Sequence, residues 1–446
     1  MTSTTRRRTM GILTGLLIID LLAFTSILPL FPTLLSYYEK PEHSDTLYEQ
    51  ITALLRSFKS LIGVPQNDRY NNVFFGGILG SFFCALQFLS SPTLGSFSDV
   101  YGRKKTMIIA CVGTLISYIV WLKSSTFTMF LLSRLIGGLS KANINIASAI
   151  VSDLYSPEEH PKGMALIGVS YSIGFLIGPM IGAFFSTFAS RDDGFSSAPA
   201  IFCILLTIIE LAAILLLLPE TLDFENQKKR SSQPQESKHS LINPIDLFRF
   251  SAVRTTVQKR QTMSEIGFIY FVYLFLYSGL EFTLPFLTYL RFQFDSMQQG
   301  RIYLFVGLLM LPIQGGLVRR TAMHRQKRLA EWGMICIIPA YMLIALCHSI
   351  STLYLGLLFY AIASGTVITS LSSLVNAVHA ESDCGTIAGV FRSLGSLARA
   401  IGPAFASAGF WLFGPTACYL FGGVLLLAPL LMLRKLVNPV KANKSE

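Results

Sequence analysis

Four charged residues lie well inside long apolar stretches of the sequence: Asp20, Arg134, Lys141 and Glu281. If those stretches cross a membrane, each charge is costly unless it is paired or faces water, so each is a functional candidate. The two cations could hold an organic anion, and either acid could carry a proton, because burial and a neighbouring cation change how readily a carboxylate is protonated. The alternative for every one of them is a fixed ion pair between helices.

The spacing of these charges predicts how they pair. Arg134 and Lys141 are seven residues apart, so on one helix they share a face and lie about 10 Å apart along its axis. Counted from the ends of the apolar stretches, Asp20 and Lys141 lie near the middle, whereas Arg134 and Glu281 lie nearer one end. Depth therefore predicts the pairs Asp20–Lys141 and Arg134–Glu281. Two amides in the same kind of stretch are further candidate ligands, Gln87 and Asn145.

Three other charges in apolar stretches are assigned structural roles. Glu210 falls in a stretch expected to form an outer helix, so we expect it to pair locally. Arg399 lies three residues before Gly402 and is interpreted as structural, although a part in a conformational switch is the alternative. Arg392 would contact the loop around Asp99 from the start of its own stretch.

Other chemistries find no support in the sequence. It contains no Gly-x-x-x-x-Gly-Lys-Ser/Thr loop for nucleotide phosphates, no residues with metal-ligand spacing and no Gly-x-Ser-x-Gly nucleophile motif. We therefore expect no enzyme activity, no cofactor and no metal. The energy for any transport would come from an ion gradient or from the substrate's own gradient.

The composition indicates a protein that crosses a membrane many times. Of its 446 residues 52% are hydrophobic and 14% charged, whereas soluble domains carry about 25% charged residues. The mean hydropathy is +0.54. Twelve stretches have roughly the 17–25 residues that a bilayer requires of a helix: 11–34, 73–94, 106–122, 127–152, 163–188, 199–218, 266–290, 302–318, 329–348, 352–377, 385–411 and 416–435.

Basic residues orient these helices. With the N-terminus inside, most of the 36 Lys and Arg residues fall on the cytoplasmic side, which is the positive-inside pattern. This pattern accounts for the net charge of +11 without a nucleic-acid partner. Both termini are then expected in the cytosol.

The polar connections divide the chain into two halves. We expect a six-helix bundle over 1–221, a cytoplasmic linker over 222–262 and a second bundle over 263–446. Within the linker, residues 241–250 could form a short helix on the headgroups or stay irregular. Residues 47–62 have apolar positions at helical spacing on the other side of the membrane, and such a helix could cap an entrance or, as we favour, cover lipid.

A glycine-rich charged turn separates the second and third stretches. It has the form Gly-x-x-x-Asp-x-x-Gly-Arg-Lys and contains Gly95, Asp99, Gly102 and Arg103. Gly95 would let two helices pack closely, and Gly102 would permit a tight reversal. This turn resembles the signature loop of the major facilitator superfamily. The resemblance implies an all-α membrane protein with 12 transmembrane helices in two six-helix bundles, and a loop that acts in the conformational switch.

Three further segments resemble the drug/proton antiporters of that superfamily. They are Asp20 followed by Pro29, the fourth stretch from Arg134 to Asn145, and the Gly178-Pro179 motif in the fifth, which is echoed by Gly402-Pro403 in the eleventh. In such antiporters the arginine of the fourth helix serves the acid of the first, which is an alternative to pairing by depth. The segments around Arg134, Glu281 and Arg392 also resemble a tetracycline-transporter-like family described as carrying organic anions.

These resemblances imply a monomeric secondary transporter in a lipid bilayer. Its substrate would be a small organic anion, moved by alternating access and exchanged for protons in efflux across the plasma membrane or an endomembrane. Helices one, four, seven and ten would line the cavity, and helices three, six, nine and twelve would lie outermost. Gly178 and Pro179 would belong to the conformational switch. The alternatives are a receptor or scaffold that does not transport, and a facilitative uniporter.

Overall fold

The protein is described here by a computed structural model that covers residues 3–40, 42–62, 71–155, 160–186, 197–222, 244–251, 253, 255–378 and 384–437. Within these residues ten helical stretches are long and apolar enough to cross a membrane. The fourth predicted span is missing from that count because it is broken into two shorter helices, and the eleventh and twelfth form one stretch, Gly389–Lys435. The first difference is a break within one span and the second is a merger of two adjacent spans, so all twelve predicted spans are present.

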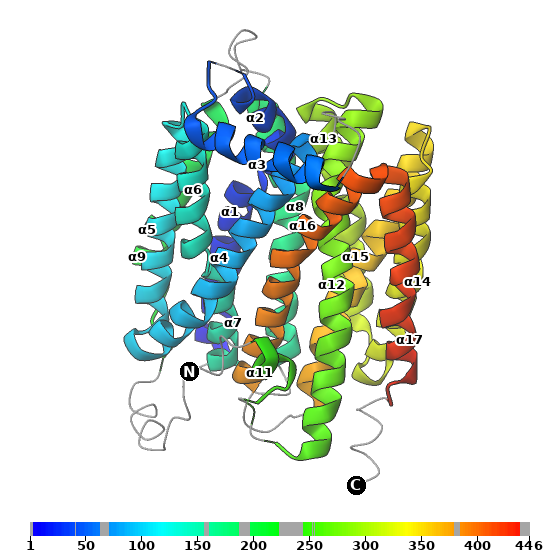
Figure 1. The fold of residues 1–446 in the computed structure, drawn as a ribbon. Coiled ribbons are helices and arrows are strands. Elements are labelled where there is room, and N and C mark those ends of the chain that lie inside the picture. The colour runs from blue at the N-terminus through cyan, green and yellow to red at the C-terminus, as the bar shows by residue number, and fades with distance from the viewer. Residues whose placement is uncertain are drawn as a thin grey trace.

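The first six spans form one bundle (Figure 1). Its helices are α1 (Ser3–Thr25) with its continuations η1 (Leu28–Leu30) and α2 (Phe31–Tyr38), α4 (Asn71–Tyr101), α5 (Arg103–Leu122), α6 (Phe127–Ser140), α7 (Asn143–Leu154), α8 (His160–Ser186) and α9 (Ala198–Leu217). The chain between α6 and α7 is not helical at Lys141 (ψ 76°), so the fourth span is broken near its middle.

The second bundle follows the short helix α11 (Pro244–Phe248), which lies in the segment where a short helix was one of two alternatives. Its elements are α12 (Val257–Phe292), α13 (Ser296–Pro312), the π-helix η4 (Ile313–Val318), η5 (Met323–Arg325), α14 (Gln326–Ala345), α15 (Ile350–Val378), α16 (Cys384–Leu425) and α17 (Leu427–Lys435). Gly414 has φ 78° inside α16 and allows the chain to reverse there, so the eleventh and twelfth spans share this element. The bundle limits at 221 and 263 stay a prediction, because residues 223–243 lie outside the described ranges.

Helix α3 (Thr46–Ile62) lies across the helix ends on the face away from α11 (Figure 1), and we call these two faces the α3 end and the α11 end. The ring of Tyr48 lies 5.2 Å from that of Phe75 and 5.4 Å from that of Phe127. Just before α3, Asp45 accepts the backbone N–H groups of Tyr48 and Thr128. The predicted amphipathic helix is confirmed, but at these contacts its apolar face covers the ends of α4 and α6 instead of lipid.

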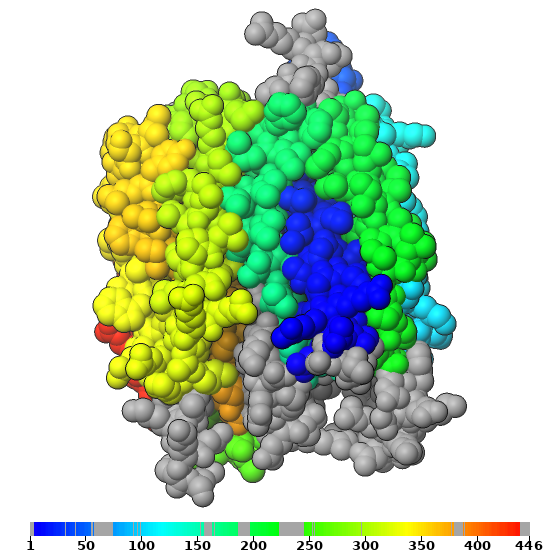
Figure 2. All heavy atoms as spheres, turned by 180° about the vertical axis from the view of Figure 1, so that it is seen from behind, coloured from blue at the N-terminus to red at the C-terminus, as the bar shows by residue number. Residues whose placement is uncertain are grey.

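A stripe of glycines lets α8 pack closely against α1, and Figure 2 shows α1 in blue between α8 and α9. A Cβ atom at Gly182 would lie 1.8 Å from the backbone oxygen of Ser26, and one at Gly178 would lie 2.0 Å from Thr25 Oγ1. Thr25 Oγ1 also donates to the oxygen of Gly174 at 2.8 Å. The Gly-Pro motif of the fifth span therefore fixes a helix contact inside the first bundle.

The predicted loop turns at Gly102, which has φ 106°. Arg103 Nε lies 2.9 Å from Asp153 Oδ2, and the backbone N–H of Arg103 donates to Glu220 Oε1 at 2.8 Å. No pattern in the sequence pointed to either acid. The side chain of Asp99 lies outside the described part of the structure. The close helix packing expected at Gly95 is not found among the described residues, because a Cβ atom there would meet none of their atoms within 4 Å.

Candidate functional site

A cavity of about 690 Å³ lies between the two bundles, within the ~300–1,000 Å³ typical of small-molecule sites. It is lined by residues of α4, α7, α8, α12, α13, η4, η5, α14, α15 and α16. No described residue of α1, α5, α9 or α17 lines it. The fourth, seventh and tenth spans therefore line the cavity as predicted, through α7, α12 and α15. The first span, α1, was also predicted to line it and does not.

The cavity reaches the α11 end and is closed at the α3 end. Val318 and Met323 line it where the chain passes from η4 to α14. Near the α3 end the backbone N–H of Ala404 on α16 donates to Ser81 Oγ on α4 at 2.8 Å. A Cβ atom at Gly300 on α13 would lie 3.3 Å from the oxygen of Pro179 on α8. Pro179 thus lies where the two bundles touch, on the closed side.

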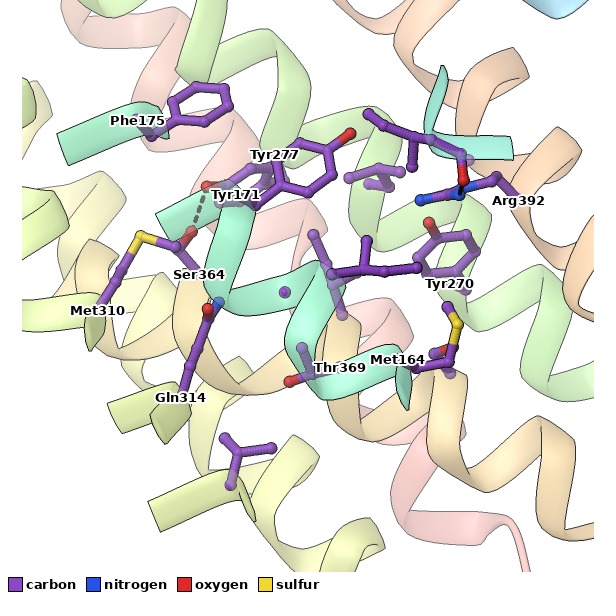
Figure 3. Close-up of a pocket in the computed structure, with 18 of the residues that line it drawn as sticks. Met164, Tyr171, Phe175, Tyr270, Tyr277, Met310, Gln314, Ser364, Thr369 and Arg392 are labelled. Carbon is purple, nitrogen blue, oxygen red and sulfur yellow. Dashed lines mark hydrogen bonds between the residues drawn. The ribbon is translucent and has the colours of Figure 1, made fainter. Parts of the chain in front are cut away.

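Aromatic rings and hydroxyl groups make up much of the cavity wall (Figure 3). Tyr277 stacks on Tyr360, with ring centroids 5.2 Å apart and 3° between the planes, and its hydroxyl donates to Ser364 Oγ at 2.7 Å. Tyr270 stacks on Phe391, with ring centroids 3.9 Å apart. Such surfaces can hold a flat apolar group and still offer hydrogen bonds at its edge.

The charges on this wall are mostly positive. Among the described residues, Arg319, Arg392 and Arg399 line the cavity together with one carboxylate, Glu281. Arg399 Nη2 lies 3.8 Å from Glu281 Oε2, and their side chains are 34% and 22% exposed. This ion pair is long and partly open to the cavity, so an anion can compete with Glu281 for the guanidinium group.

Arg392 joins the two bundles across the cavity. Its Nη1 donates to the oxygen of Ile144 and to Ser148 Oγ, each at 2.6 Å, and both acceptors belong to α7. In Figure 3 the side chain of Arg392 lies beside Tyr270. Whether Arg392 also meets the Asp99 loop stays a prediction, because the side chain of Asp99 lies outside the described part of the structure. The structural interpretation of Arg399 is incomplete, because its guanidinium group lines the cavity.

Asp20 and Lys141 form an ion pair inside the first bundle. Lys141 Nζ donates to Asp20 Oδ1 at 2.5 Å, and the two side chains are 4% and 1% exposed. Gln87 Nε2 donates to the backbone oxygen of Lys141 at 3.2 Å, and Gln87 and Asn145 line the cavity. The pair predicted from depth is confirmed. The ion pair does not line the cavity wall, however, so Lys141 is no direct ligand there in this conformation.

Arg134 has no carboxylate partner among the described residues. Its guanidinium carbon lies 5.4 Å from the ring centroids of both Trp121 and Phe130, and its Nε donates to Ser133 Oγ at 3.2 Å. Both predicted pairings of Arg134, with Glu281 by depth and with Asp20 by resemblance, are therefore wrong. Stacking on aromatic faces is the interaction that stabilises this buried cation.

Glu210 lies on an outer helix as predicted, since no described residue of α9 lines the cavity, but its partner belongs to the fourth span. Its side chain is 1% exposed, and Asn143 Nδ2 of α7 donates to its Oε1 at 3.1 Å. Asn143 is two residues from Lys141, which binds Asp20. Glu210 therefore belongs to the buried cluster around the break between α6 and α7.

The tyrosines of α12 were not predicted as site residues. Tyr270, Tyr277 and Glu281 all line the cavity, and their spacing of seven and four residues places them on one helix face. This spacing along α12 could have identified the two tyrosines from the sequence. Arg392 and Arg399 show the same seven-residue spacing on α16.

Comparisons with known proteins agree with this architecture. A family model described as Major Facilitator Superfamily matches residues 13–403. The chain is 42% identical over 438 residues to the Mus musculus protein named major facilitator superfamily domain-containing protein 10, covering 96% of this chain and 93% of that one. It is 23% identical over 354 residues to the class B tetracycline resistance protein of Escherichia coli, covering 79% and 81% of the two chains.

A solved structure resembles the whole chain. The crystal structure of the human organic anion transporter MFSD10 (TETRAN) superposes with a TM-score of 0.82 at 40% sequence identity. The match covers 96% of this chain and 99% of that one.

Proposed function

The chain belongs to the major facilitator superfamily, a class of membrane transporters and not of enzymes, and from this premise we propose that it carries small organic anions across a membrane with protons. One observation carries the proposal: the cavity between the bundles presents three arginines and one carboxylate among aromatic walls. Charge-assisted hydrogen bonds from such arginines contribute about 1.5–3 kcal/mol each. An aromatic carboxylate or sulfonate is the ligand class that fits. The similar human protein is named an organic anion transporter, which supports the same class.

Arg399 and Glu281 would link anion binding to protonation. A proton on Glu281 removes the charge that attracts Arg399 at 3.8 Å, and an anion on Arg399 takes the cation away from Glu281. Each event therefore promotes the other. Cooperative binding moves the proton and the anion in the same direction, whereas the antiporter resemblance implied exchange. Asp20, the other proton carrier considered, is buried against Lys141 and would act from outside the cavity.

Replacing Arg399 with glutamine should weaken binding of an aromatic carboxylate about ten- to a hundredfold, because one charge-assisted contact of about 1.5–3 kcal/mol is lost. The measurement is counterflow of a radiolabelled aromatic carboxylate by the purified protein in liposomes, with the neutral amide of the same acid as the control ligand. Arg301→Gln is the matched control variant, because Arg301 is exposed on α13 and does not line the cavity.

The same liposomes test the alternatives. Cotransport with protons is supported if the protein exchanges the carboxylate and also accumulates it when the side from which the carboxylate enters is made acidic. Accumulation under the opposite gradient supports antiport, and exchange that ignores pH supports a uniporter. No exchange at all supports a receptor or scaffold. Unchanged affinity in Arg399→Gln would contradict the assignment of the site. The orientation with both termini in the cytosol, the monomeric state and the membrane concerned stay predictions.

A further inference from the structure

A buried cluster in the first bundle contains two acids and one base. Asp20 on α1, Lys141 at the break of the fourth span and Glu210 on α9 are all at most 4% exposed. Lys141 binds Asp20 Oδ1 directly, whereas Glu210 accepts a hydrogen bond from the neutral amide of Asn143. If all three groups are ionised, the cluster carries one uncompensated negative charge. Such a charge in a protein interior costs several kcal/mol, and binding one proton removes it.

The other groups around Glu210 do not supply the missing positive charge. From α5, Cys111 and Tyr118 face the cluster, and both are neutral when protonated. The one titratable side chain on the described part of α8, Tyr171, lines the cavity instead. Arg134 lies two helical turns from Lys141, about 10 Å along α6, where it stacks on aromatic rings.

The contacts show which acid takes the proton. Asp20 Oδ1 is held by the ammonium group of Lys141 at 2.5 Å, so the charge of Asp20 has a partner in direct contact. The hydrogen bond to Glu210 from Asn143 is 3.1 Å long and comes from an uncharged donor. The carboxyl group of Glu210 is therefore the one that is neutral when the cluster holds its proton.

We propose that Glu210, although it lies outside the cavity, is a proton-binding residue of this protein, and that the broken fourth helix connects its protonation to anion binding. The proton site stands on the buried charges alone, whereas its part in coupling rests on the transport function proposed above.

A continuous set of contacts joins Glu210 to the cavity. Asn143, which donates to Glu210, is the first residue of α7, and the next residue, Ile144, accepts a hydrogen bond from Arg392 on the cavity wall. Gln87 lines the cavity and donates to the backbone oxygen of Lys141. An anion that binds Arg392 competes for the donor that holds α7. It thereby acts on the helical turn that positions Asn143 against Glu210.

Infrared difference spectroscopy of the purified full chain tests the proton site directly. Between neutral and basic buffer, where exposed carboxylates such as Glu265 are already ionised, the unmodified protein should show loss of the carbonyl-stretch band of a protonated carboxylic acid. Glu210→Gln should lack this band, because the amide keeps the shape and the acceptor oxygen but cannot titrate. Glu265→Gln is the matched control, since Glu265 is exposed on α12, and its spectrum should equal that of the unmodified protein.

In liposomes, accumulation driven by a pH gradient is divided by exchange measured at equal pH on both sides. In Glu210→Gln this ratio should fall to the value found when no gradient is imposed. A band that survives in Glu210→Gln, or an unchanged ratio, would overturn the proposal. If that variant does not fold, Asn143→Ala decides: removing the donor to the carboxylate should move the midpoint of the band to higher pH, and an unmoved midpoint overturns the proton site. A protein that shows the Glu210 band but exchanges no anion would refute the transport function and leave the proton site intact.

Discussion

Replacing Lys141 with methionine should destabilise the folded protein by about 3–5 kcal/mol, the cost of removing one partner from a buried ion pair. Asp20 Oδ2 has no hydrogen-bond partner among the described residues, and Lys141 is the partner of Oδ1. The substitution therefore leaves a buried carboxylate without compensation. Thermal unfolding in detergent measures the loss, which should shrink as the pH falls, because protonation neutralises the stranded acid.

The double variant Asp20→Leu/Lys141→Met is the control for this prediction. Replacing both partners of a buried ion pair with apolar groups of similar volume is often neutral or stabilising. We therefore expect the double variant to melt close to the unmodified protein, well above Lys141→Met. Equal instability of the single and double variants would mean that Lys141 acts through packing or through its contact with the Phe24 ring at 4.8 Å, and not through Asp20.

Gly182→Ala should also destabilise the protein severely, by about 3 kcal/mol or more, the upper range for overpacking. The added Cβ atom would lie 1.8 Å from the backbone oxygen of Ser26. Because the obstacle is backbone and not the end of a flexible side chain, α8 and α1 must move apart. The fraction of protein that stays monodisperse after heating measures the effect.

Gly15→Ala is the matched control for Gly182→Ala. Gly15 lies on α1, and a Cβ atom there would meet nothing within 4 Å. Inside a helix, alanine is favoured over glycine by about 0.5–1 kcal/mol, so Gly15→Ala should melt at the same temperature as the unmodified protein or slightly higher. A similar loss at both positions would contradict the assignment of Gly182 to a tight helix contact.

Patterns along the chain predicted the helices and one buried pair, because both depend on distance along the helix axis. Asp20 and Lys141 lie at the same depth, and the structure joins them. Arg134 and Glu281 also lie at similar depth, yet they face different surroundings: rings of Trp121 and Phe130 in one case and the cavity in the other. The depth of a residue in the membrane does not show which side of its helix it occupies. Arg134 and Glu281 do not pair because their side chains point to different sides.

The cavity cations were missed for a related reason. Arg392 and Arg399 are charges in an apolar stretch, as Lys141 is, but which of these cations faces the cavity depends on how the two bundles lean together. That arrangement is set by contacts such as Ala404 with Ser81, which have no pattern along the chain. The break at Lys141 was missed as well, since no proline lies within 127–152 to mark it, although Gly138, Ser140 and Asn143 near it are weak helix formers.

The broken fourth span also bears on how the chain enters the membrane during synthesis. At 1.5 Å per residue, α6 and α7 are each about 20 Å long, short of the ~30 Å hydrocarbon layer. Lys141, near the middle of the span, adds about 2.5–3.5 kcal/mol to the cost of inserting it as an isolated segment, and Arg134, nearer one end, adds a smaller amount. This segment is therefore a weak insertion signal by itself. The acid that offsets Lys141 lies on α1, which leaves the ribosome first, so Asp20 is already in the bilayer when its partner arrives.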